Sequence, residues 1–183
     1  MISNNVEKLE NLLESINKEA RVCIVECSVF IERRACETLG RILGIDWKES
    51  ESLGYGSGSL SFDNKIRLIN DLKGVEKIVK TKFLNFMSIR NKFAHLDDID
   101  SFQNYFSIIR SSKDRKKELI SWFPKLRWDA QDVDVERLYK SAFFLLTLDL
   151  NSKLFDIETS HAFEKGKSLG EMEALDDFMS TTR

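Results

Sequence analysis

Residues 88–95 read Ser-Ile-Arg-Asn-Lys-Phe-Ala-His and end a helix that the apolar spacing predicts over about 75–96. At roughly 100° per residue, one face of this helix carries the apolar side chains Phe83, Phe86, Met87, Ile89 and Phe93. Arg90 projects from the middle of the same face. A guanidinium buried there without a partner would cost several kcal/mol. Arg90 therefore needs a carboxylate, a group of carbonyls or a wet cleft.

A second predicted helix, over about 19–43, also carries a charge on its apolar face. That face is formed by Ile24, Ile31, Ala35, Leu39, Ile42 and Leu43. Glu32 falls within the same arc, whereas the other acidic residues of this helix project to the opposite side. When two opposite charges each lie on an apolar face, the simplest arrangement is that they pair with each other. The sequence thus predicts a buried structural ion pair between Glu32 and Arg90.

The composition favours helices along the whole chain. Its 183 residues are 42% hydrophobic and 32% charged, which suits a single domain with a buried core. One proline and eight glycines are too few for the turns of an all-β protein. We therefore expect an all-α, up-and-down helical bundle over 1–160, followed by a polar, partly mobile tail over 161–183.

Helices are predicted at about 4–18, 19–43, 61–73, 75–96 and 102–123, with an additional C-terminal helix at about 135–160. The first two either join or break near Asn17, and the fifth has a break near 111–112.

The cysteines and the apolar runs indicate the cellular compartment of the protein. Cys23, Cys27 and Cys36 all fall within one predicted helix, which is typical of small buried residues in a reducing compartment rather than of a disulfide framework. The only histidines, His95 and His161, lie far from them in the sequence, so we expect neither a metal nor a cofactor. The start of the chain is polar, and the strongest apolar run, 142–150, is too short for a bilayer. We expect a cytoplasmic protein that does not bind a membrane.

The end of the 75–96 helix gathers three side chains with catalytic potential. Asn91 and His95 are four residues apart, so their side chains meet on one edge of the helix. His95 can exchange a proton near neutral pH, Arg90 can hold a phosphate, and Asn91 can orient the imidazole. These are the parts of a metal-independent ribonuclease. The alternative is structural, with Arg90 paired to an internal acid and His95 ending the helix.

A basic segment follows, in which cations alternate with aromatic residues. It contains Lys113, Arg115, Lys116, Lys117, Lys125 and Arg127, with Trp122, Phe123 and Trp128 among or beside them. Such a pattern can hold phosphates and stack bases of a nucleic acid. The alternative is a solvated helix face whose aromatic residues lie in the core. The whole chain has a formal net charge of −2, so any positive field would be local.

The sequence resembles a known superfamily in three places: the run 59–66, the run 71–73 and the motif Arg90-Asn91-Lys92-Phe93-Ala94-His95. An Arg-x4-His motif late in a helix resembles the signature of the HEPN superfamily. The three segments together look like its mannitol operon repressor (MltR-like) group. The resemblance implies an all-α fold and a homodimer. In the ribonucleases of the superfamily it implies an active site made by Arg90 and His95, with Asn91 as the polar residue after the arginine.

Two acidic residues after the motif favour a member without catalysis. Toxin-type members often have a tyrosine two residues after the histidine, where this chain has Asp97, and Asp98 follows it. Two carboxylates there would repel RNA phosphate. We therefore expect an HEPN- or MltR-like regulatory or interaction protein that acts as a homodimer and binds an RNA or protein partner. The alternative is a metal-independent endoribonuclease of a toxin or defence system that uses Arg90 and His95.

Overall fold

A computed structural model describes residues 10–54, 56–109, 112–128 and 133–181. Over these residues all the regular secondary structure is helical, which confirms the predicted all-α fold class. The elements are η1 (Ser15–Asn17), α2 (Ala20–Leu43), α3 (Phe62–Lys73), α4 (Lys77–His95), α5 (Phe102–Ile108), α6 (Ser112–Trp122) and α7 (Val135–Thr181). A helical turn over 10–14 precedes η1, and the chain is non-helical at 18–19, so the first two predicted helices are separate.

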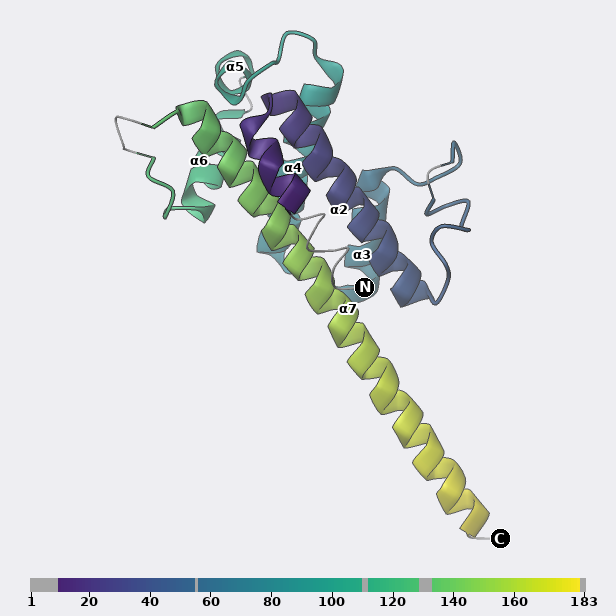
Figure 1. Ribbon diagram of the computed structural model, residues 1–183. Coiled ribbons are helices and arrows are strands. Elements are labelled where there is room, and N and C mark those ends of the chain that lie inside the picture. Colours follow the sequence, from purple (N-terminus) through teal and green to yellow (C-terminus); the bar gives the residue numbers. More distant parts are fainter. Residues whose placement is uncertain (1–9, 55, 110–111, 129–132, 182–183) are drawn as a thin grey trace.

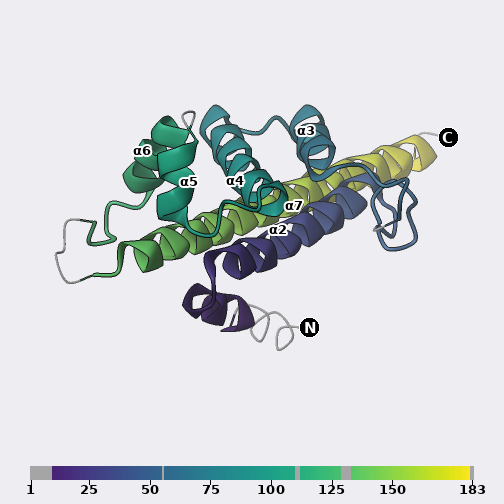
Figure 2. The same cartoon turned by 90° about the horizontal axis from the view of Figure 1, so that it is seen from above.

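The two longest helices form the spine of the bundle. α2 and α7 lie side by side, and α3 and α4 cover one side of the pair (Figures 1 and 2). α5 and α6 pack beside the first turns of α7, and η1 lies on the other side of the spine (Figure 2). This arrangement places the end of α4 beside the start of α2.

Local sequence signals set several helix ends. Gly44 and Gly74 follow α2 and α3 with φ of 70° and 66°, in the left-handed region that favours glycine. The Ser61 hydroxyl caps α3 by accepting a hydrogen bond from the Asn64 backbone N–H. The Ser101 hydroxyl caps α5 in the same way, by accepting a hydrogen bond from the Asn104 backbone N–H.

Aromatic side chains fill the core where α4, α5 and α7 meet. Phe86 of α4 stacks on Phe143 of α7 with ring centroids 4.7 Å apart. Phe93, three residues after Arg90, packs against Phe102 of α5 at 5.3 Å. All four rings are buried. This layer fixes the half of α4 that ends in the Arg90–His95 motif.

The last helix is longer than the hydrophobic pattern of the sequence predicts. The expected end near residue 160 is wrong, because α7 continues to Thr181 and crosses the predicted boundary between the bundle and the tail. The chain after 160 has few large apolar residues, and this was the reason to expect a tail. It contains no proline, however, and good helix formers such as alanine, glutamate, lysine and leucine let the helix propagate.

Candidate functional site

The Arg90–His95 motif occupies the last two turns of α4, as predicted. Arg90 is half-buried, and its Nη1 donates a hydrogen bond to Oδ1 of Asn91 at 3.0 Å. His95 lies in the last turn and is exposed. Asn91 therefore holds the guanidinium beside it, whereas its spacing of four residues from His95 predicts that it orients the imidazole.

The turn after the motif is fixed by a cation from another helix. Nη2 of Arg21 in α2 donates to the backbone oxygens of Leu96 and Ile99, both at 2.9 Å. The side chains of Asp97 and Asp98, between those two residues, are exposed. The surface next to His95 is therefore acidic.

The predicted ion pair between Glu32 and Arg90 is wrong. Glu32 Oε1 lies 3.4 Å from Nζ of Lys65 in α3, and the Lys65 side chain is only 1% exposed. Helical projection finds the arc of α2 in which Glu32 lies, but it does not tell which neighbouring helix covers that arc. The signal for Lys65 was present, because it lies on the same face of α3 as the buried Phe62 and Ile69.

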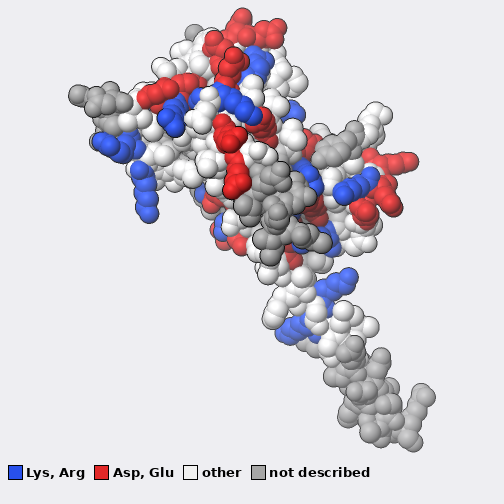
Figure 3. All heavy atoms as spheres, in the orientation of Figure 1, with Lys and Arg blue, Asp and Glu red and all other residues white. Residues whose placement is uncertain are grey.

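The predicted basic segment is exposed at most of its cations. Lys113, Lys116, Lys117, Lys125 and Arg127 are exposed on α6 and the segment that follows it. In Figure 3, basic side chains project at the left of the molecule, where Figure 1 labels α6. Arg115 differs from them, because it is half-buried and its charge acts on Tyr105. Burial raises the pKa of Tyr105, and the nearby Arg115 guanidinium partly opposes that rise.

The aromatic residues of the same segment are engaged with the body of the protein. Nζ of Lys82 lies 5.6 Å from the centroid of the Trp122 ring. Nε1 of Trp128 donates to the Phe123 backbone oxygen at 2.9 Å, and the Trp128 ring packs 5.4 Å from that of Tyr139. The segment is thus suited to contact phosphates through its cations rather than to stack bases on its rings.

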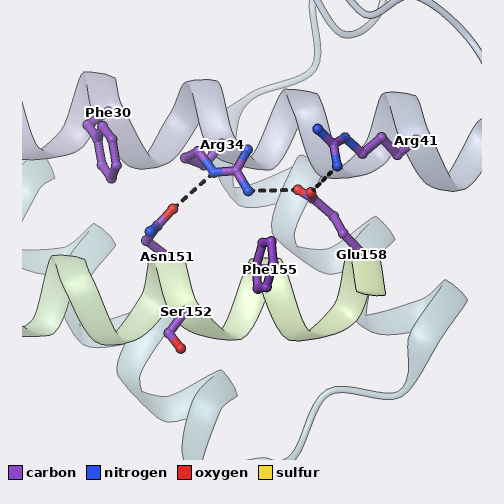
Figure 4. Close-up of a pocket in the computed structure, with 7 residues that line it drawn as sticks. All are labelled: Phe30, Arg34, Arg41, Asn151, Ser152, Phe155 and Glu158. Carbon is purple, nitrogen blue, oxygen red and sulfur yellow. Dashed lines mark hydrogen bonds and ion pairs between the residues drawn. The ribbon is translucent and has the colours of Figure 1, made fainter. Parts of the chain in front are cut away.

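A buried ion network between α2 and α7 was not foreseen from the sequence (Figure 4). The Glu158 side chain is 3% exposed, and its Oε1 accepts from Arg34 Nη2 at 2.9 Å and from the Thr38 hydroxyl at 2.7 Å. Arg41 Nη1 lies 2.9 Å from the other carboxylate oxygen, as an ion pair without the alignment of a hydrogen bond. The charge of Glu158 is therefore neutralised by arginines from the facing helix.

Two more contacts complete the environment of Arg34. Its Nε donates to Oδ1 of Asn151 at 2.9 Å, and its Nη1 bonds to the Glu37 carboxylate. Burial alone would raise the pKa of Glu37, but hydrogen bonds from Arg34 and Arg33 lower it below its ordinary value. Sequence reasoning missed Glu158 because it sits near the predicted end of the last helix.

A cleft of about 370 Å³ opens over this network. Phe30 of α2 and Phe155 of α7 point into the space between the two helices (Figure 4). The Phe155 side chain is 57% exposed at the surface of the cleft. An exposed aromatic ring next to a buried carboxylate that arginines neutralise marks a surface for contact.

All three cysteines are free and buried, as predicted. A hydrogen bond with Cys27 lowers the pKa of Cys23, while the same bond and burial raise the pKa of Cys27. The Ser15 hydroxyl also lies 3.5 Å from the sulfur of Cys23. Burial raises the pKa of Cys36, which lies near the charged amine of Lys65. These thiols belong to the core of α2.

Neither a metal-ligand cluster nor a membrane span is found in the part of the chain that the structure describes. No three or more histidine, cysteine, aspartate or glutamate side chains gather there as a metal site would require. No helix among the same residues combines the length and apolarity needed to cross a bilayer. Comparison of the chain with family models, with characterised proteins and with solved structures gives no match.

Proposed function

We propose that this chain is a non-enzymatic regulatory protein, HEPN-like and closest to the mannitol operon repressor group, that acts as a homodimer and binds RNA. One observation carries the proposal: five exposed cations on α6 and the described segment after it outnumber the one exposed carboxylate there, Asp114, whereas the exposed charges beside His95 are acidic. Lys113, Lys116, Lys117, Lys125 and Arg127 lie on α6 and the segment after it, whereas Asp97 and Asp98 lie beside His95. RNA phosphate is attracted to the first surface and repelled from the second.

The geometry of the motif supports binding without cleavage. Arg90 donates to Asn91, its neighbour on the same helix, and no acid–base partner for His95 is found among the described residues. A ribonuclease needs one group to take the proton of a 2′-hydroxyl and another to stabilise the phosphorane. An exposed histidine flanked by carboxylates meets only part of that need.

The alternative function, a metal-independent endoribonuclease, is favoured by one feature. His95 is exposed on the same helix end as Arg90, so RNA has access to both. The two functions differ in whether the purified protein cleaves RNA in the presence of EDTA. They also differ in the effect of His95→Ala. In a ribonuclease this substitution should abolish cleavage, whereas a protein that only binds RNA has no cleavage to lose.

The first experiment measures RNA binding and cleavage with the full-length protein. We expect binding of a labelled single-stranded RNA to weaken about a hundredfold between about 50 and 200 mM salt if five phosphates are contacted. We expect no cleavage, with or without EDTA. Cleavage that resists EDTA and is lost in His95→Ala would establish the ribonuclease instead. Absence of RNA binding at low salt would overturn the proposal and leave a protein partner.

A matched pair of variants locates the RNA surface. Lys117→Glu/Lys125→Glu reverses two exposed charges of the basic segment and should weaken binding at least about tenfold. Lys48→Glu/Lys80→Glu reverses two exposed lysines elsewhere and makes the same change in net charge. The control should lose no more than about twofold by long-range electrostatics. Equal losses in the two variants would show that binding is not located at α6.

A further inference from the structure

The cleft between α2 and α7 is lined by one face of each helix, and each face carries a phenylalanine and a charged residue. Phe30 and Arg41 of α2 lie within about 20° of each other at 100° per residue. Phe155 and Glu158 of α7 are three residues apart, so they are neighbours on one side of that helix. The two faces meet across the space of about 370 Å³ (Figure 4). A space of this size, with aromatic rings and a few charged groups, is typical of a small-molecule site.

One oxygen of the buried carboxylate in this cleft lacks a hydrogen bond. Oε1 of Glu158 accepts from Arg34 and from Thr38, whereas Oε2 is buried and accepts from none of the described residues. The large majority of buried polar side-chain atoms have a hydrogen-bond partner. Nη1 of Arg41 lies 2.9 Å from Oε2, but without the alignment of a hydrogen bond. Oε2 can therefore accept from an N–H group of a ligand that takes the place of the Arg41 guanidinium.

Arg41 is the partner of Glu158 that can move. Its side chain is 64% exposed, and Glu158 is its one polar partner within the described part of the chain. A guanidinium carries five N–H donors, so most of those of Arg41 are available to a ligand. It can turn away from Oε2 and hold a carboxylate in a two-pronged contact without breaking any other interaction. Arg34, in contrast, is fixed by its bonds to Asn151 and Glu37.

The charges around the cleft indicate the charge of its ligand. Arg34 and Arg41 are balanced by Glu37 and Glu158, so the four charges sum to zero. A ligand with a net charge would add an unbalanced charge beside a buried carboxylate, whereas a zwitterion adds none. The ammonium and carboxylate groups of an α-amino acid are attached to the same carbon. The ammonium can therefore pair with Glu158 while the carboxylate pairs with Arg41, so that one ion pair of the chain is replaced by two.

The aromatic rings indicate the side chain of the ligand. Phe155 is exposed and adjacent to Glu158 on α7, so a ligand held by its ammonium at Glu158 has its side chain beside the Phe155 ring. Phe30 points into the same space from α2 (Figure 4). Aromatic rings pack favourably on one another in stacked or edge-to-face arrangements. An aromatic side chain therefore suits this part of the cleft.

We propose that the α2–α7 cleft binds a free aromatic α-amino acid. Its ammonium donates to Oε2 of Glu158, and its carboxylate pairs with Arg41. Its ring packs on Phe155 at the side that faces Phe30. The ligand bridges the two longest helices of the bundle. The cleft shares no residue with the basic segment or with the Arg90–His95 motif, so the inference goes beyond the proposed function.

Isothermal titration calorimetry with the full-length protein tests the ligand class. We expect L-phenylalanine to bind saturably with a dissociation constant below about 1 mM. Phenethylamine lacks the carboxylate, phenylpropionate lacks the ammonium and L-alanine lacks the ring, so each should bind at least about tenfold more weakly. Absence of saturable binding of L-phenylalanine would overturn the proposal. Equal binding of any of the three analogues would also overturn it, because the group that the analogue lacks would then not be recognised.

Matched variants at exposed positions test the place of binding. Phe155→Ala and Arg41→Gln should each weaken L-phenylalanine binding at least about tenfold. The controls are Phe163→Ala, at an exposed ring farther along α7, and Arg67→Gln, at an exposed arginine that pairs with Asp63 on α3. Each control should change the dissociation constant less than about twofold. Thermal unfolding followed by circular dichroism verifies that all four variants are folded. Equal losses in the variants and their controls would place binding outside the cleft and overturn the proposal.

Discussion

The interface between α2 and α7, named here the α2–α7 seam, and the end of α4 each carry an arginine at the margin of the core. The two arginines differ in the number and kind of their partners. At the seam, Arg34 bonds to Asn151, Glu37 and a Glu158 carboxylate that is 3% exposed. At the end of α4, Arg90 bonds only to its neighbour Asn91. A buried charge is tolerated only when partners neutralise it, so the stability of the seam depends on these contacts. At the end of α4, the half-buried Arg90 side chain adds little to the stability of the fold and stays accessible.

The largest expected effect comes from opening the seam. Glu158→Ala removes the carboxylate that neutralises Arg34 and Arg41, and we expect the free energy of unfolding to fall by about 3 kcal/mol. Urea denaturation at pH 7 measures the change. Glu164→Ala is the control, since that exposed carboxylate pairs with Lys73 outside the core and its loss should not be measurable. Similar effects of the two variants would show that the network does not stabilise the seam.

Lys65 offers a test at a second buried charge. Lys65→Met keeps most of the side-chain volume but leaves Glu32 without its partner, so we expect a loss of about 2 kcal/mol in denaturant unfolding. In Lys65→Met/Glu32→Gln the stranded charge is gone, and part of the stability should return. If the double variant is less stable than Lys65→Met, the pair is not coupled as the 3.4 Å contact indicates.

A smaller effect concerns the thiol beside Lys65. Burial raises the pKa of Cys36, so the folded protein keeps this proton when the unfolded chain begins to lose it. The stability contributed by the protonated thiol is fully present below about pH 8.5, the ordinary thiol value, and declines as pH rises toward the folded-state pKa. In Cys36→Ala this decline should be shallower by up to about 1.4 kcal/mol per pH unit. Unfolding curves between pH 7 and 10 check this, and equal slopes would contradict it.

The smallest expected effect is at the motif itself. Arg90→Ala breaks a contact with a neighbouring side chain, and we expect a loss below about 1 kcal/mol. His95→Ala, at an exposed position, should leave the thermal unfolding curve unchanged. A loss above about 3 kcal/mol for Arg90→Ala would instead indicate that the guanidinium is paired inside the core, and the contrast with the seam would disappear.

The candidate site was only partly predictable. The Arg90–His95 helix end and the exposed cations after Ser112 could be read from spacing and composition, because both depend on neighbours in sequence. The role of Asn91 could not, since its amide reaches either Arg90 or His95 on the same helix. The aromatic residues near the basic segment were also ambiguous, because only packing against Tyr139 and Lys82 shows that their faces are occupied.

The all-α class, most helix boundaries and the burial of the cysteines follow from local patterns in the sequence. Helix periodicity, glycine at Gly44 and Gly74 and a serine cap at Ser61 act within a few residues, so they can be read without the fold. The pairing of Glu32 with Lys65, and of Glu158 with Arg34 and Arg41, depends instead on how the helices pack in space. Such partners lie on helices distant in sequence, and packing among several helices chooses between pairings that local periodicity leaves equivalent.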